Sequence, residues 1–158
     1  MTNKEISIHS CNLKEDFEIA KSITKDYMLW LGMDLSFQNT DKELQIFSVM
    51  YGLPSGAYIY AKIGGRVAGG VGVRYLTSDI CEMKRLYVYE EYRYQGIASL
   101  LCSKIISISK DLSYSCMRLD TVSKLVEANS LYDKLGFKDI PKYYDNPDLT
   151  VRYMELTL

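Results

Sequence analysis

The sequence predicts an α/β (α+β) fold, a mixed sheet with helices on both of its faces. Strand-like segments outnumber helical ones in the first half of the chain, whereas the two kinds alternate after it. A chain of 158 residues has the size of one domain, and it contains no internal repeat, linker or low-complexity tract. We therefore expect a single domain over residues 1–158.

The N-terminal part predicts one strand and two helices. Ile6–Ser10 alternates between apolar and polar residues, which is typical of a strand. From Leu13 onward, apolar residues recur every three or four positions, which predicts a helix ending near Gly32. A shorter helix is expected to begin at Thr40 or Asp41, because either side chain can cap its first turn.

The middle of the chain predicts a hairpin. Ala57–Ile63 has the composition of a strand, and Gly64 with Gly65 supplies the positive φ angles of a tight turn. A return strand is expected over Arg66–Leu76. Three glycines inside it weaken a regular strand and predict a bulge or a close contact: Gly69, Gly70 and Gly72.

The C-terminal half alternates between strands and amphipathic helices. The expected segments are a strand over Cys81–Val88, a helix over Gly96–Leu112, a strand over Met117–Val122, a helix over Val126–Leu135 and a closing strand over Val151–Leu158. Gly136 is expected as the left-handed residue that ends the second of these helices.

Composition argues against several classes of protein. With 19 Lys plus Arg against 20 Asp plus Glu, the net charge is −1, so no nucleic-acid partner is expected. Every apolar stretch ends well short of the ~20 residues that span a bilayer, and the polar start Met1–Glu5 does not read as a signal peptide. We therefore expect a cytoplasmic protein with no membrane partner.

No metal site is expected either. The four cysteines form no C-x-x-C pair, and His9, the only histidine, lies in the first expected strand. The cysteines are interpreted as small core residues. A Ser-His-Asp mechanism is not expected, because its histidine would have to be His9 in this strand. The sequence also has no G-x-x-x-x-G-K-[ST] phosphate loop.

The most informative stretch is the connection from the strand at Glu82–Val88 to the helix at Gly96. The first turn of a helix has unpaired N–H groups and about half a positive charge, which suits a phosphate or diphosphate. Gly96 permits close backbone approach, and Ala98 keeps the next turn slim. A tight strand-to-helix connection would also favour a glycine, so both interpretations stay open on these grounds.

Two motifs carry a resemblance. Arg93-x-x-Gly96-x-Ala98 is similar to the [QR]-x-x-G-x-[GA] acyl-CoA motif of the GNAT N-acetyltransferase superfamily. The segment Glu127–Phe137 resembles the family signature A-x-x-[FL]-Y-x-K-x-G-F. The two motifs stand in the family's order, and the similarity runs from about Ala57 to the closing residues.

The resemblance implies transfer of an acetyl group from acetyl-CoA to a primary amine of a small molecule or a peptide. It implies a mostly antiparallel central sheet with a splay, made by a bulge, between two central strands. The turn amides would hold the diphosphate, and the preceding strand would pair with the pantetheine arm. The residues expected to contact the coenzyme are Leu86, Tyr87, Val88, Arg93, Tyr94, Gln95, Gly96, Ile97, Ala98, Ser99 and Asn129.

The resemblance also implies catalytic residues. Tyr132 matches the family's general acid, which would protonate the departing thiolate, although a tyrosine beside this apolar stripe could also only pack. Glu82 is the candidate base, but strict alternation places it on the face of Leu86 and Val88 unless a bulge intervenes. In the alternative, Glu82 is an ordinary solvated or paired glutamate of the strand, and a chain of water molecules acts as the base.

Two alternative functions stay open. The same fold could keep acyl-CoA as a regulatory ligand without turnover, or it could acetylate aminoacyl-tRNA, against which the near-neutral charge argues. A sheet edge near the C-terminus could pair two chains in a homodimer. Tyr143, Tyr144 and Asp145 are candidates for lining the acceptor site.

Overall fold

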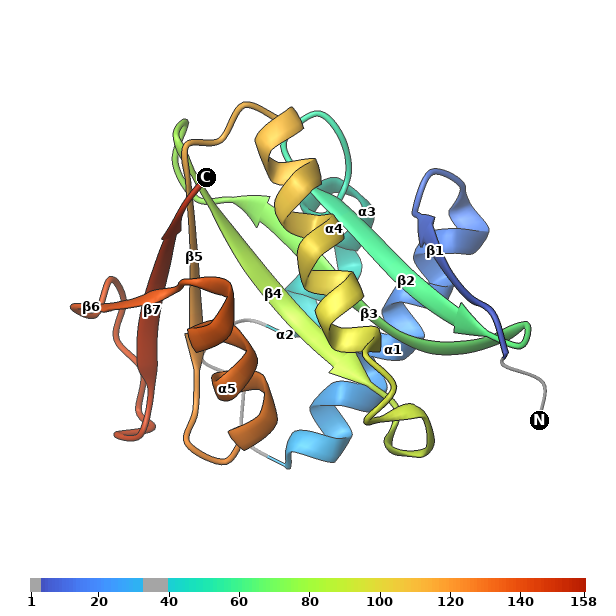
Figure 1. Cartoon of the computed structure of the whole chain (residues 1–158). Helices are drawn as coiled ribbons and strands as arrows, with labels where there is room; N and C mark the ends of the chain where they lie inside the picture. Colours follow the sequence, from blue (N-terminus) through green and yellow to red (C-terminus); the bar gives the residue numbers. More distant parts are fainter. Residues whose placement is uncertain (1–3, 33–39) are drawn as a thin grey trace.

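A computed structural model describes residues 4–32 and 40–158, and within them seven strands form one sheet in the order β1-β2-β3-β4-β5-β7-β6 (Figure 1). The strands are β1 (Ile6–Ser10), β2 (Ala57–Ile63), β3 (Arg66–Tyr75), β4 (Ile80–Val88), β5 (Cys116–Thr121), β6 (Lys138–Ile140) and β7 (Arg152–Thr157). Neighbouring strands are antiparallel except β4 and β5, which run parallel. The expected mixed, mostly antiparallel sheet is confirmed.

Helices cover both faces of the sheet, as expected. α4 (Ile97–Asp111) crosses one face, with α5 (Val126–Leu135) beside it, while α1 (Lys14–Leu31) lies on the other face (Figure 1). The short helices α2 (Thr40–Gln45) and α3 (Phe47–Met50) lie near α1. Each long helix buries residues three or four positions apart, because that spacing forms one side of a helix. In the described part of the chain, no helix is long and apolar enough to cross a membrane.

Three short elements were not predicted from the sequence: α3, a 3₁₀ turn at Glu90–Tyr92, and β6. Each spans only three or four residues, too few to show a periodic pattern. The longer predicted elements all form, with ends that differ from the prediction by a few residues.

A β-bulge interrupts β4. Gly70 of β3 pairs with Tyr87 and Gly72 with Lys84, so two β4 residues oppose the single residue between these glycines. One of the two, Arg85, has a φ of 64°. The bulge reverses the alternation of side chains, and Glu82 therefore lies on the opposite face from Leu86, which packs with α4 and α5. The conflict that strict alternation raised for Glu82 is thereby resolved.

The predicted close contact at the glycines of β3 is also confirmed. A Cβ atom at Gly69 would lie 2.3 Å from the backbone oxygen of Tyr87. A Cβ at Gly72 would lie 2.7 Å from the ring of Tyr51. Glycines here let β3 lie close to the bulged strand and to an aromatic ring beneath it.

The sheet splits between β4 and β5. The two strands pair only at Ile80–Cys116, Cys81–Met117 and Glu82–Arg118, whereas β5 continues to pair with β7 as far as Thr121. Figure 1 shows the two strands diverging from the end at which they pair. The predicted splay between two central strands is therefore present.

Candidate active site

A cleft occupies the opening between β4 and β5. It is lined by Met83–Val88 of β4, by Leu119–Thr121 of β5 and by one side of α5. Tyr27, Trp30 and Leu31 of α1 close it from the other face of the sheet, and Arg93 and Tyr94 border its end near α4. The cleft thus runs from the middle of the sheet toward the beginning of α4.

The beginning of α4 presents unpaired backbone donors. Gly96 is the N-cap residue with a φ of 80°, Tyr94 has a φ of 64°, and no side chain caps the helix. The N–H groups from Tyr94 to Ser99 make no hydrogen bond to any residue within 4–32 or 40–158. A Cβ atom at Gly96 would have no heavy atom within 4 Å. Packing therefore does not require this glycine, whereas its left-handed conformation and the open space beside it suit an anion held by backbone amides.

Arg93 ties this turn to the sheet and to α1. Its Nε donates a hydrogen bond of 3.0 Å to the carbonyl oxygen of Val88. Its guanidinium lies 4.6 Å from the ring centroid of Trp30 and 5.7 Å from that of Tyr87. Such cation–π contacts fix the planar guanidinium against the aromatic rings. Arg93 therefore positions the turn, and its predicted contact with the coenzyme stays a prediction.

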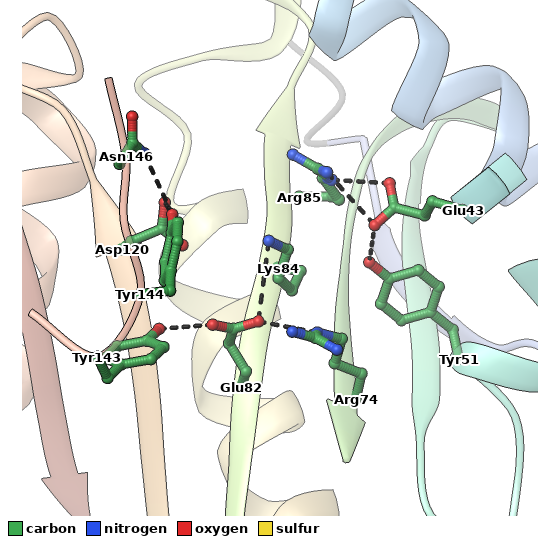
Figure 2. A network of polar contacts seen from close by, with 10 residues as sticks. All are labelled: Glu43, Tyr51, Arg74, Glu82, Lys84, Arg85, Asp120, Tyr143, Tyr144 and Asn146. Carbon is green, nitrogen blue, oxygen red and sulfur yellow. Dashed lines mark hydrogen bonds and ion pairs between the residues drawn. The ribbon is translucent and has the colours of Figure 1, made fainter. Parts of the chain in front are cut away.

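Glu82 is the centre of an ion-pair network on the face of the sheet opposite α4 (Figure 2). Its side chain is 1% exposed, and its Oε1 accepts a hydrogen bond of 2.8 Å from Nε of Arg74. Oε2 accepts one of 2.5 Å from the hydroxyl of Tyr143, and Nζ of Lys84 lies 3.8 Å from Oε1. Burial raises the pKa of Glu82, but the charges of Lys84 and Arg74 and the Tyr143 hydrogen bond together hold it below the ordinary value. A carboxylate so paired is a weak proton acceptor.

A second hollow adjoins this network. Its lining residues come from α2, α3, the β3–β4 hairpin and the loop before β7: Glu43, Met50, Arg74, Leu76, Glu82, Lys84, Tyr143 and Tyr144. Lys84 lines both the cleft and the second hollow. The two hollows therefore meet at β4, near the point where β4 leaves β5.

A buried ion pair holds the bulge in place. Nε and Nη2 of Arg85 donate hydrogen bonds of 3.0 and 3.3 Å to the two carboxylate oxygens of Glu43. The hydroxyl of Tyr51 donates a further bond of 2.8 Å to Oε1 of the same carboxylate (Figure 2). Burial lowers the pKa of Arg85, but the charge of Glu43, the influence of Tyr51 and the hydrogen bonds to Glu43 together raise the pKa above its ordinary value. The pair links the left-handed residue of β4 to α2.

The comparisons with known proteins fit this geometry. Residues 21–137 match the acetyltransferase (GNAT) family. The chain belongs to this family. An uncharacterised N-acetyltransferase of Schizosaccharomyces pombe is 40% identical over 160 residues, which cover 100% of this chain and 98% of the relative. The resemblance seen in the two sequence motifs is confirmed.

Solved structures share the GNAT fold. A GNAT acetyltransferase of Staphylococcus aureus has a TM-score of 0.79 at 20% identity, covering 97% of this chain and 99% of its own. The PaiA N-acetyltransferase of Thermoplasma acidophilum, solved in complex with coenzyme A, has a TM-score of 0.69 at 20% identity, with 96% and 99% covered. At 20% identity, these similarities show a shared fold only.

In this GNAT chain, Tyr132 borders the cleft from α5. Tyr132 is 6% exposed, and its ring packs edge-on against that of Phe137, with 5.8 Å between the ring centroids. Its hydroxyl has no hydrogen-bond partner among residues 4–32 and 40–158. Burial raises the pKa of Tyr132 well above its ordinary value, so the hydroxyl stays protonated at neutral pH. The ring packs in the core while the residue also borders the cleft.

Asn129 joins α5 to the end of β5. Its Oδ1 accepts a hydrogen bond of 2.7 Å from the hydroxyl of Thr121, and its Nδ2 donates one of 3.0 Å to the carbonyl oxygen of Val122. The amide therefore holds the helix that carries Tyr132 against the strand that lines the cleft. Its predicted contact with the coenzyme stays a prediction.

Asp120 is a cleft carboxylate that sequence reasoning missed. Its Oδ2 accepts a hydrogen bond of 2.6 Å from the hydroxyl of Tyr144, which in turn accepts one of 3.2 Å from Nδ2 of Asn146. Tyr143 and Tyr144 line the second hollow, and their predicted place at the acceptor stays a prediction. Asp145 lines neither hollow, because its side chain is 95% exposed and pairs with Lys142. The sequence marks Asp120 only as one of the polar residues that alternate with apolar ones along β5.

Proposed function

We propose that the protein transfers the acetyl group of acetyl-CoA to a primary amine, by direct attack within a ternary complex. The observation that carries the proposal is the cleft between β4 and β5, which leads to the unpaired amides at the beginning of α4. Membership of the GNAT family supports acyl transfer from coenzyme A. The fold likeness to PaiA, which was solved with coenzyme A, supports the same coenzyme.

Two parts of the chain fit acetyl-CoA. The diphosphate would bind the N–H groups of Tyr94–Ser99, where the α4 dipole and the open space at Gly96 favour an anion. The pantetheine arm would lie along Leu86–Val88, beyond the last residue of β4 that pairs with β5. Bound there, acetyl-CoA supplies an activated thioester.

The reaction balances without any further reactant. The amine nitrogen attacks the thioester carbonyl carbon, a C–N bond forms, and the C–S bond breaks to release the thiolate of coenzyme A. The nitrogen loses a proton, and the thiolate gains one. A free amine of pKa about 10.4 is almost wholly protonated at pH 7, so its deprotonation costs roughly 4–5 kcal/mol.

The proton transfers assign roles to residues of this chain. Tyr132 would donate its hydroxyl proton to the departing thiolate, since the hydroxyl is protonated and has no other described partner. The lowered pKa of Glu82 makes that residue a weak base. We infer that the amine proton leaves through water in the open cleft, and the base role predicted for Glu82 is tested below.

Release of coenzyme A tests the proposal. The purified protein is incubated with acetyl-CoA and a panel of primary amines, and free thiol is followed with a thiol reagent. Amine-dependent thiol release with an equal amount of N-acetyl product, identified by mass spectrometry, is the expected result. Acetyl-CoA binding without release for any amine would instead show the regulatory module, and absence of binding by calorimetry would reject both.

A further inference from the structure

Lys84 lies where the cleft and the second hollow meet, because its side chain lines both. That side chain is 10% exposed, so nine-tenths of it is buried. Its ion-pair partner is Glu82, but the 3.8 Å between Nζ and Oε1 is too long for a hydrogen bond. Within residues 4–32 and 40–158, the ammonium donates no hydrogen bond.

In the described part of the chain, no carboxylate is hydrogen-bonded to Lys84. Arg74 is bonded to the same oxygen of Glu82, so two cations share one carboxylate. Glu43, the other carboxylate of the second hollow, accepts two hydrogen bonds from Arg85. Asp120, across the opening, is bonded to Tyr144, so the Lys84 ammonium has no hydrogen-bonded counter-ion among the described residues, and a buried charge is costly unless it is paired. A ligand carboxylate would supply that partner.

Asp120 faces the same opening from β5. Glu82 of β4 and Arg118 of β5 are the last paired residues of the two strands. Lys84 and Asp120 each lie two residues further along their strands. Because side chains two residues apart lie on the same face of a strand, both lie on one face of the sheet, with the splay between them. Figure 2 shows Lys84 in front of β4, with Asp120 and Tyr144 across from it beside the neighbouring strand. Oδ1 of Asp120 has no hydrogen-bond partner in the described part of the chain.

We propose that the acceptor is a small amino acid, whose carboxylate binds Lys84 and whose amino group is held by Asp120. This inference rests on the proposed function and names its substrate class. A cation and a carboxylate on opposite sides of one opening are complementary to a molecule that carries both an ammonium and a carboxylate group.

The same charges disfavour other amines. A polyamine would place a second ammonium near Lys84 and Arg74, where like charges repel. A phosphorylated amine would bring about two negative charges into an opening that Asp120 and Glu82 also line. The carboxylate is the group that matches the charge of the site.

The wild-type protein tests the substrate class directly. Acetylation rates are measured for the twenty L-amino acids, each beside its carboxamide and its decarboxylated amine, and for spermidine and phosphoethanolamine. We expect the best amino acid to exceed its carboxamide and its amine by at least about 10-fold in kcat/KM. Equal or faster acetylation of the carboxamide, spermidine or phosphoethanolamine would overturn the inference.

Variants of Lys84 test the residue. Lys84→Met is expected to raise KM for the amino acid by about 10-fold or more and to leave the kcat/KM of its carboxamide within about 3-fold. Lys84→Arg keeps the charge and should retain most of the preference. Lys104→Met, at an exposed position on α4, is the matched control and should change neither. An unchanged preference in a folded Lys84→Met variant would contradict the assignment.

The two proposals fail separately. Acetylation of amines without any preference for a carboxylate would reject the amino-acid acceptor and keep the acetyltransferase. No thiol release with any amine would reject the acetyltransferase, and the acceptor with it. If Lys84→Met does not fold, the wild-type panel and Lys84→Arg still decide the acceptor.

Discussion

The two sides of the active site differ in how their polar groups are used. On the side of α4 and α5, the backbone donors of Tyr94–Ser99 and the hydroxyl of Tyr132 have no partner in the described chain. On the other side, Glu82 and Glu43 each contact two or more partners. Unpaired groups are available to a ligand, whereas paired ones stabilise the fold. Changes to the unpaired groups should therefore affect catalysis or binding, and changes to the paired groups should affect stability.

Tyr132→Phe is expected to have the largest effect. Loss of the hydroxyl removes the proposed general acid, so kcat should fall about 1,000-fold, or about 4 kcal/mol in activation free energy. The dissociation constant of acetyl-CoA, measured by calorimetry, should change little. Tyr27→Phe, which alters another buried tyrosine of the cleft, should keep kcat within about 3-fold. Unchanged turnover in Tyr132→Phe would leave this tyrosine a packing residue only.

Gly96→Asp should weaken acetyl-CoA binding by about 100-fold, because it places a negative charge where the diphosphate is proposed to bind. Gly96→Asn is the matched control, since asparagine has the same shape and also tolerates a positive φ. The asparagine variant should bind more tightly than the aspartate variant, and thermal unfolding should show both folded. Equal affinities of the two variants would contradict a phosphate site at this turn.

Glu82→Gln should mainly affect stability. At pH 7 it leaves Arg74 and Lys84 without a counter-charge, and we expect a loss of about 2–3 kcal/mol in unfolding free energy, reduced because Arg74 is partly exposed. The pKa of Glu82 is lowered in the folded state, so its contribution is present above the ordinary value of 4.5 and lost as the pH falls through the folded value. Urea unfolding of both proteins from pH 7 to 3 should therefore show the difference shrinking below about pH 4.5.

The same variant tests the base role of Glu82. With folded protein at saturating substrates, Glu82→Gln should retain kcat within about 10-fold, because a carboxylate of lowered pKa is a weak base. A loss of more than about 100-fold, with the alkaline shift of the pH–rate profile that removal of a base produces, would instead establish Glu82 as the base.

Asn129→Ala should have the smallest effect. Loss of its two hydrogen bonds to the end of β5 should lower the unfolding free energy by about 1–2 kcal/mol. Asn129→Asp keeps the acceptor for Thr121 and should lose less stability. If Asn129 also contacts the coenzyme, calorimetry on the folded Asn129→Ala variant should show acetyl-CoA binding weakened by about 10-fold; unchanged affinity would leave a structural role alone.

The long elements could be predicted because their patterns are local. The amphipathic stripe of α4, the glycine turn after β2 and the motif from Arg93 to Ala98 each lie within a few turns of chain. The glycines of β3 predicted a bulge or a close contact, but nothing near Arg85 in the sequence marks its position in β4, since arginine rarely takes a positive φ.

The acceptor side could not be predicted, because it depends on contacts between distant segments. Tyr143 reaches Glu82 across 61 residues, and Glu43 reaches Arg85 across 42. Lys84 and Asp120 come to face one opening only through the register of the single parallel strand pair. Asp145 was a candidate because an acidic group would attract an ammonium substrate, yet its side chain is 95% exposed, and Asp120 lines the cleft instead.

The extra residue in β4 has a consequence for variation of this enzyme. Because of it, Lys84 and Arg85 are neighbours in the chain and both lie away from the face that packs with α4. Deleting Lys84 or Arg85 would remove the bulge and restore regular alternation, which keeps the flanking side chains on their present faces but loses one of these two side chains. Acceptor preference could therefore diverge by substitution of Lys84, whereas a deletion here would also remove the bulge beside the splay.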